Sequence, residues 1–420
     1  MLNKRLMGNR AQLTDHFETR GLTQASGVLY AALLLIGSLA APAHAQPAQR
    51  TQRLFQRLAG VPLPLADPRG VQMEALVGQG RLAEAAHIAT QDDNFLNVTV
   101  KHAFTPISNR NETPLFELND LVATAIGVVR DDRNAKELLT GNYFYRGDPA
   151  LPGIPNVFYE QDFQGDNDHY RALESANVNL AQSLVRVPMP SYLTDYAGLL
   201  TTRAWFEAHM FAGTYRRPIE FAFREFMCTP ISVWRDQTNP HDRIRQDVSR
   251  APGGSAMLFQ TQCATCHSGM DAMSTAYRKF NYVERPANRT RIFYLDENER
   301  YNINSTIYPD GYRSPDDSWI NYAVRNRNVA FGWRSGPSEQ PVSGYGIHQF
   351  GQMIADSYGF STCMTQRVFK EVCRRDPVEA ELAQGGAVDR LAHDFEGNGY
   401  KLRRLFELAA IEPGCLGSQP

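Results

Sequence analysis

The stretch Gln262-Cys263-Ala264-Thr265-Cys266-His267 carries the strongest signal in this chain of 420 residues. Two cysteines three positions apart lie on about one turn of a helix, where their thiols can add to the two vinyl groups of one haem. The histidine that follows then lies under the iron as its proximal ligand. The spacing therefore predicts one covalently attached haem c, bound through Cys263, Cys266 and His267.

Two other kinds of site also use closely spaced cysteines. A structural zinc site needs a second pair of ligands at a suitable spacing, and the other cysteines of the chain are isolated from one another. A thioredoxin-like redox pair needs a strand–helix–strand context, which the flanking sequence lacks. The chain contains a single haem motif, which excludes a multihaem conduit and a two-haem peroxidase arrangement within one chain.

The ligand on the opposite face of the iron decides between electron transfer and chemistry at an open site. Met353 is our tentative distal ligand, because it lies well downstream of the motif, as a distal ligand commonly does in small cytochromes c. It also shares a helical face with Phe350, so a core position is the alternative. His348 and His209 are further candidates, as are another ligand or none.

Three arginines near the motif are candidates for pairing with the haem propionates, because a guanidinium matches the geometry of a carboxylate. They are Arg245, Arg250 and Arg278. For each of them, a solvated surface position is the alternative.

The amino terminus is typical of an exported protein. Four basic residues before position 21 precede the apolar run Val28–Ile36, and small residues follow as far as Ala45. This order predicts a secretory signal peptide over residues 1–45. The apolar run is short for a bilayer-spanning helix of roughly twenty residues, which favours cleavage over a retained anchor. No other stretch is apolar enough to cross a bilayer, so we expect no membrane span in the mature chain and a periplasmic or otherwise exported location.

Four cysteines remain outside the haem motif. They are Cys228, Cys363, Cys373 and Cys415. An even number in an oxidising compartment favours disulfides over buried free thiols. Four cysteines allow three pairings, and the sequence does not choose among them.

Composition and periodicity indicate the class of fold. Hydrophobic residues make up 43% and charged residues 21%, which is ordinary for a globular protein. The net charge of −2 gives no reason to expect nucleic-acid binding. We predict a mainly α fold with an amino-terminal, mostly helical region over 46–190. A cytochrome c-like haem domain over 191–420 follows, with a long irregular insertion at 284–346.

Several helices are predicted in detail. Pro218 suits a first helical position, and apolar residues then recur on one face as far as Met227. Asp376-Pro377-Val378-Glu379 is typical of a capping box with proline at the first helical position. Other apolar periodicities predict helices at 121–129 and 137–139, around 347–354 and 364–372, and over 391–408.

Stretches on both sides of the motif resemble the large planctomycete-type c-type cytochromes. The run from Tyr196 to Cys228 is similar to that family's conserved upstream segments, and 268–281 resembles its "x-x-M-D-P-x-G-F-x-x-E-x-F-D" pattern, with Ala272 and Ser274 in place of proline and glycine. The segment 350–376 resembles its closing helices. The resemblance covers about 196–410 and implies an exported haem-binding protein whose haem residues are Cys263, Cys266 and His267. It implies no substrate.

The sequence favours an electron-transfer protein with an unidentified redox partner protein, because no catalytic motif is present. The alternatives are a haem-dependent oxidoreductase with an open distal site and a structural or sensor component of an envelope complex. In an oxidoreductase, aromatic side chains of the insertion would roof a substrate site; otherwise they only pack the insertion onto the haem domain, which we favour. These aromatic residues are Tyr301, Tyr308, Tyr312, Trp319 and Trp333.

Overall fold

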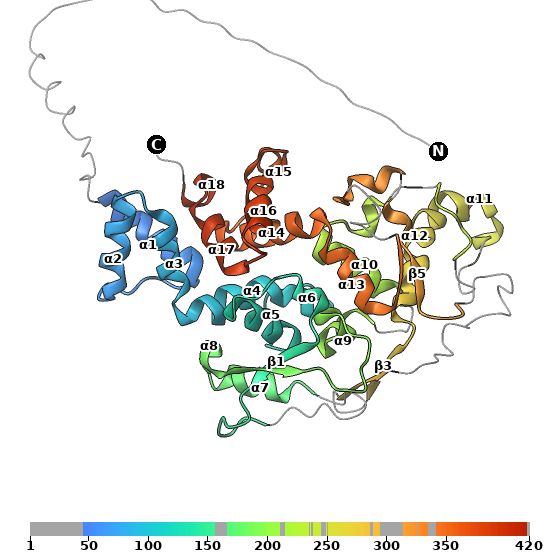
Figure 1. Ribbon diagram of the computed structural model, residues 1–420, viewed down its shortest axis with the longest axis horizontal. Helices are drawn as coiled ribbons and strands as arrows, with labels where there is room; N and C mark the ends of the chain where they lie inside the picture. The colour runs from blue at the N-terminus through green and yellow to red at the C-terminus, as the bar shows by residue number, and fades with distance from the viewer. Residues whose placement is uncertain are drawn as a thin grey trace, which may run out of the picture. The chain divides into compact units, whose positions relative to one another are not determined.

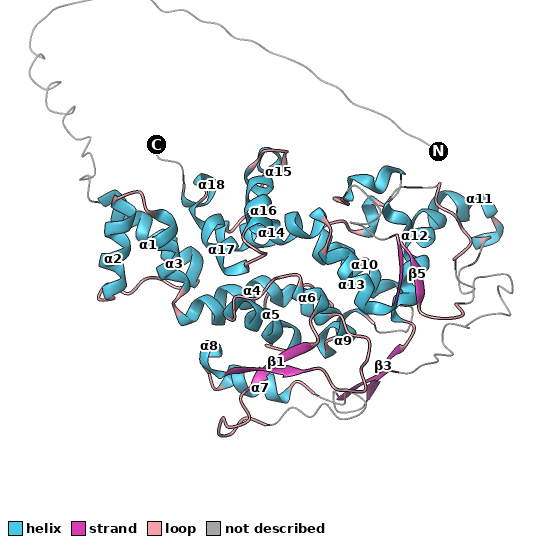
Figure 2. Ribbon diagram, in the orientation of Figure 1, coloured by secondary structure: helices cyan, strands magenta, loops and turns pink. Residues whose placement is uncertain are grey.

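Helices make up most of the structure, a computed structural model, and the predicted mainly α class is confirmed (Figure 1, Figure 2). The structure describes residues 45–155, 166–210, 215–234, 236, 238–244, 249, 251–285, 289–294, 314–324, 326–334 and 342–417. The chain divides into two compact units, Met1–Gln46 and Pro47–Pro420. The predicted signal peptide lies outside the described residues except for Ala45, and every described residue from Pro47 onward belongs to the second unit. No helix among the described residues is both long and apolar enough to cross a membrane.

The first half of the chain is built from short helices. They are α1 (Ala45–Ala59), α2 (Pro68–Gly78), α3 (Leu82–Thr90), the π-helical η1 (Phe95–Val100), α4 (Lys101–Phe104), the 3₁₀ turn η2 (Thr105–Ser108), α5 (Asp120–Arg130), α6 (Glu137–Thr140), α7 (Asp168–Ser175) and α8 (Leu180–Ser183). The helices expected at 121–129 and 137–139 are therefore confirmed.

The middle of the chain carries the haem motif. Its elements are η3 (Gly198–Thr201), α9 (Arg203–His209), α10 (Arg216–Met227), η5 (Ile231–Val233), η6 (Pro252–Gly254), α11 (Ala256–Leu258), the π-helical η7 (Phe259–Cys263), α12 (Ala264–Ser274) and η8 (Thr275–Tyr277). The carboxyl-terminal part consists of α13 (Gly346–Ala355), α14 (Tyr358–Cys373), α15 (Glu379–Leu382), α16 (Ala387–Gly397), α17 (Leu402–Ile411) and α18 (Pro413–Leu416).

Strands occur in the described residues as three antiparallel pairs. The pairs are β1 (Tyr143–Gly147) with β2 (Leu184–Pro188), β3 (Phe280–Arg285) with β4 (Arg289–Tyr294), and β5 (Ser318–Ile320) with β6 (Ser343–Tyr345). In register, Tyr145 lies opposite Arg186 and Trp319 lies opposite Gly344. The described part of 284–346 contains only such short strands and the 3₁₀ turns η11 (Tyr322–Val324) and η12 (Asn326–Phe331).

The apolar core brings helices from the first hundred residues of the chain together with the carboxyl-terminal helices. Helix α14 packs against α10, α16 and α17, and α17 also packs against α3. Phe95 and Phe406 meet edge to face with their ring centroids 5.3 Å apart. Because α10 in turn packs against α12, the helix that carries the haem motif is supported by this core on one side.

Two predicted helix starts differ from the structure. Helix α10 begins at Arg216, two residues before Pro218, which the first turn tolerates because its N–H groups have no partner within the helix. The apolar face predicted for this helix is buried as expected. Helix α15 begins at Glu379 and not at Pro377, because the Glu381 carboxylate accepts the Val378 N–H at 2.9 Å. Asp376, predicted to cap this helix, lies 2.8 Å from Lys370 instead.

Candidate haem site

The haem motif lies at the start of α12, after a short helical run. Ser255 begins this run, because its hydroxyl accepts the Leu258 N–H at 3.2 Å. The π-helical turn η7 then ends at Cys263, and α12 continues through Cys266 and His267. One side of α12 faces the core at Gly269, where an added Cβ would lie 3.0 Å from the Trp234 ring. The three predicted haem residues therefore share one continuous helical segment.

The His267 imidazole is held by a buried carboxylate one turn further along the helix. Asp271 is fully buried, and its Oδ1 lies 3.2 Å from Nδ1 of His267. An ionised carboxylate only accepts hydrogen bonds, so Nδ1 carries a proton, and in the neutral imidazole the lone pair is on Nε2. This is the tautomer that binds a metal through Nε2.

Asp271 is also paired with a cation from a different helix. Arg216, at the start of α10, places Nε 2.6 Å from Oδ1 and Nη2 3.2 Å from Oδ2. Burial alone raises the pKa of Asp271, but the hydrogen bond from His267 and the Arg216 charge together hold this pKa well below its usual range. Asp271 is thus a carboxylate at neutral pH.

The two thiols of the motif are unpaired and half-buried. Cys263 packs against a small apolar cluster of Ile244, Phe259 and Ala264. The Cys266 sulfur lies 4.0 Å from the Ile231 carbonyl oxygen, and burial, followed by the proximity of Cys263, raises the pKa of this thiol.

The remaining four cysteines form two disulfides, which selects one of the three pairings that the sequence allowed. Cys228 at the end of α10 is bonded to Cys363 in α14. Cys373 at the end of α14 is bonded to Cys415 in α18. Within the described residues, no group of three His, Cys, Asp or Glu side chains is placed to hold a metal ion.

Met353, the tentative distal ligand, lies on α13 and is fully buried. Its sulfur accepts a hydrogen bond from the Asn321 amide nitrogen, at 3.1 Å. Helix α13 packs against η8, the turn that follows α12. In this arrangement the thioether is part of the core.

The two histidine alternatives differ in accessibility. His209 is fully buried, with its Nε2 2.9 Å from the Ile107 carbonyl oxygen and its ring stacked on Phe221 at 4.2 Å. His348 is half-buried, and its Nδ1 donates to the Tyr196 carbonyl oxygen at 2.9 Å. Nε2 of His348 therefore keeps a lone pair, whereas His209 is enclosed in the core.

Among the predicted propionate partners, Arg278 is the one that the structure describes. Its Nε is buried and has no hydrogen-bond partner among the described residues. Arg245 and Arg250 lie outside the described residues. A half-buried guanidinium with a free donor fits a carboxylate-bearing group such as a haem propionate.

The aromatic residues of the insertion that are described pack onto the helices. Trp319 is fully buried, donates its indole N–H to the Gly346 carbonyl oxygen at 2.9 Å and lies edge to face with Phe350. Trp333 donates to the Ala323 carbonyl oxygen at 2.7 Å. Both tryptophan side chains therefore pack the described part of 284–346 against its surroundings. Tyr301, Tyr308 and Tyr312 lie outside the described residues.

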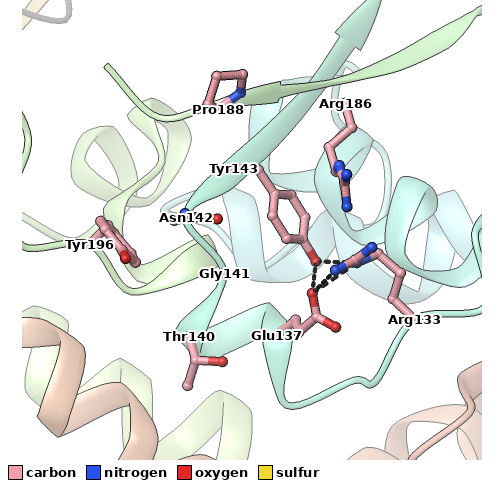
Figure 3. Close-up of a pocket in the computed structure, with 9 residues that line it drawn as sticks. All are labelled: Arg133, Glu137, Thr140, Gly141, Asn142, Tyr143, Arg186, Pro188 and Tyr196. Atoms are coloured by element: carbon pink, nitrogen blue, oxygen red, sulfur yellow. Dashed lines mark hydrogen bonds and ion pairs between the residues drawn. The ribbon is translucent and has the colours of Figure 1, made fainter. Parts of the chain in front are cut away.

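A separate hollow of about 390 Å³ lies at the start of β1 (Figure 3). Its lining consists of Arg133, Glu137, Thr140, Gly141, Asn142, Tyr143, Arg186, Pro188 and Tyr196. Three of the polar side chains in this lining are hydrogen-bonded to one another. The Arg133 Nε and the Tyr143 hydroxyl both donate to the Glu137 carboxylate, at 2.8 and 2.7 Å. None of its lining residues belongs to α12, so this hollow is separate from the candidate haem site.

Comparisons of the chain with protein-family models, with curated proteins and with solved structures find no match. The site therefore has to be judged from its own residues. The sequence predicts Cys263, Cys266 and His267 as haem residues, but it assigns no role to Asp271 or Arg216. A carboxylate four residues after the histidine was the available signal for Asp271, since such a pair lies on one helix face. No local signal marks Arg216, which is 55 positions away.

Proposed function

We propose that the chain is an exported c-type cytochrome that transfers electrons through one covalently bound haem. The observation that carries this proposal is the state of the cysteines. Four of them pair into disulfides, while Cys263 and Cys266 stay free beside a histidine whose Nε2 is available. Two free thiols and an imidazole on one helix are the donor set for covalent haem attachment.

The residues around the motif support this proposal. The thiols would hold the porphyrin, and His267 would be its proximal ligand, oriented by Asp271. Val233, two residues after the Ile231 that lies beside Cys266, and Met257, six residues before Cys263, expose 45% and 73% of their surface, which a bound porphyrin would help to cover. The bound haem would supply a one-electron couple. The protein contributes the attachment, the ligand geometry and the local charge.

Export, the haem domain and the family assignment belong to the same proposal. Two disulfides suit an oxidising compartment such as the periplasm. The helical part over 191–420 would be a cytochrome c-like domain of the planctomycete type, and a redox partner protein would exchange electrons with it.

A second candidate function is a haem-dependent oxidoreductase or gas sensor with an open distal site. The observation in its favour is that Met353 and His209 are both hydrogen-bonded within the core. If neither ligand reaches the iron, the sixth position is open to small molecules unless His348 or another group occupies it.

The test is the spectrum of the exported protein, together with matched cysteine variants. We expect Cys263→Ala/Cys266→Ala to lose covalent haem, measured as a haem-stained band in a denaturing gel. The control Cys373→Ala/Cys415→Ala removes the same number of thiols and is expected to keep the haem. Covalent haem retained by the first double variant, or absent from the wild-type protein, refutes the proposal.

Carbon monoxide separates the two functions. A reduced protein whose spectrum does not respond to carbon monoxide has a closed iron and supports electron transfer. Met353→Leu and His348→Gln then identify the ligand, because the variant that loses it becomes responsive. A wild-type spectrum that shifts on carbon monoxide favours the oxidoreductase or sensor.

A further inference from the structure

We infer that Asp271 is a positioning residue for the haem, which orients His267 and, with Arg216, sets the reduction potential of the iron. This inference rests on the proposed function, because it concerns the proximal ligand of the proposed haem. Nothing in the haem motif itself requires either residue. Both are identified by their contacts in the folded chain.

The hydrogen bond to Asp271 prevents His267 from binding iron through Nδ1. Asp271 is fully buried on the same face of α12, and its Oδ1 accepts a hydrogen bond from the Nδ1–H group of His267 at 3.2 Å. Rotation of the ring would leave a buried carboxylate without this donor, which is costly away from water. Nε2 is therefore the nitrogen that can bind iron. Carboxylate–histidine–metal arrangements of this kind fix the ring and raise the basicity of the ligand.

A negative charge next to the proximal histidine acts on the iron in a definite direction. Ferric haem carries one more positive charge than ferrous haem, so the Asp271 carboxylate stabilises the oxidised form and lowers the reduction potential. Arg216 shares the same carboxylate oxygen, at 2.6 Å, and its positive charge opposes this effect. Asp271 and Arg216 therefore shift the potential in opposite directions.

A purely structural role for this ion pair predicts a different result. The pair joins α10 to α12, so a structural role requires only that breaking it lowers stability. Removing either partner would then have the same kind of effect. A role in setting the potential requires shifts of opposite sign for the two partners, which a structural role does not produce.

The experiment measures reduction potentials of the exported holoprotein by optical titration. Asp271→Asn keeps an oxygen that accepts from Nδ1 but removes the charge, and we expect its potential to rise. Arg216→Gln is expected to lower the potential. We expect about a tenfold change in the ratio of reduced to oxidised protein in each case, which equals about 59 mV for a one-electron couple. Asp271→Glu, which restores the charge, is expected to return toward the wild-type value.

Glu407→Gln is the matched control. Glu407 is also a buried carboxylate that accepts from a histidine, with Oε1 2.8 Å from Nδ1 of His87, but it lies on α17. We expect this variant to keep the wild-type reduction potential. Wild-type potentials in both Asp271→Asn and Arg216→Gln, or shifts of the same sign in these two variants, overturn the inference.

The failure of this inference is distinguishable from failure of the proposed function. A wild-type protein without covalent haem overturns both. A wild-type protein with haem whose potential is insensitive to the two substitutions overturns only the role of Asp271. If Asp271→Asn fails to attach haem, the other two variants test the inference. A lowered reduction potential in Arg216→Gln together with a near-wild-type potential in Asp271→Glu supports it, and an unchanged or raised potential in Arg216→Gln overturns it.

Discussion

His209 makes the stability of this protein depend on pH in a way that one substitution can isolate. Its imidazole, at the end of α9, has no exposed surface and lies between Trp205 and Phe221, with ring centroids 4.3 and 4.2 Å away. Burial lowers the pKa of His209 from 6.5 to about 3. The hydrogen bond to the Ile107 carbonyl oxygen acts in the opposite direction and raises the pKa.

The charged residues around His209 act in the same direction as burial. Arg217, Arg224 and Arg110 each lower its pKa further. The folded protein therefore keeps His209 neutral down to about pH 3, while the unfolded chain takes up a proton below about pH 6.5. Stability from this group is fully present above pH 6.5 and is lost as the pH falls from 6.5 toward 3. At pH 5 the 1.5-unit difference from the unfolded pKa amounts to about 2 kcal/mol.

The assay is urea unfolding of wild type and His209→Gln at pH 7 and pH 5, followed by circular dichroism. Glutamine can still donate to Ile107 but does not titrate. We expect the drop in the free energy of unfolding between the two pH values to be smaller in the variant by about 2 kcal/mol. His393→Gln, at a histidine with a 67% exposed side chain, is expected to leave the drop unchanged. An equal drop in wild type and His209→Gln would show that the reasoning is wrong.

Three further changes test the fold. Cys228→Ala/Cys363→Ala opens a disulfide that spans 135 positions, and loop entropy predicts a loss of about 5 kcal/mol in the free energy of unfolding; a reductant should destabilise the wild type but cost this variant less. Gly346→Ala is expected to lower the free energy of unfolding in urea by about 2 kcal/mol or more, because its φ is +63° and the new Cβ would overlap the Asp195 carboxylate; an unchanged midpoint contradicts this geometry. Asp195→Ala removes the acceptor of the first N–H groups of α13 and is expected to cost about 1 kcal/mol, with Asp195→Asn as the milder control.

Local patterns predicted the helices well because each depends on residues close in sequence. The apolar face of α10 follows from Ile219, Phe223 and Phe226, which recur at helical spacing and are all buried. The same periodicity gave α5 and α13. The helix starts were less certain, because capping depends on one or two side chains: Glu381 accepts the Val378 N–H and shifts the start of α15.

Features that depend on distant residues were not accessible from the sequence. Strand β1 was not predicted, because its partner β2 pairs Tyr143 with Pro188, 45 positions later. The disulfide pairing was left open for the same reason. At the candidate site, the Cys-x-x-Cys-His motif is contiguous and can be recognised in the sequence, whereas Arg216 reaches Asp271 only through the packing of α10 against α12.

The position of the Cys228–Cys363 disulfide has a topological consequence for the part of the chain that contains Cys263, Cys266 and His267. The haem motif and the whole of residues 284–346 lie between its two cysteines, so this part of the chain forms a covalently closed ring. One proteolytic cut anywhere in that ring yields two fragments that remain tethered. A nicked molecule would therefore keep its full mass in a non-reducing denaturing gel, and only a reductant would release the fragment that carries His267.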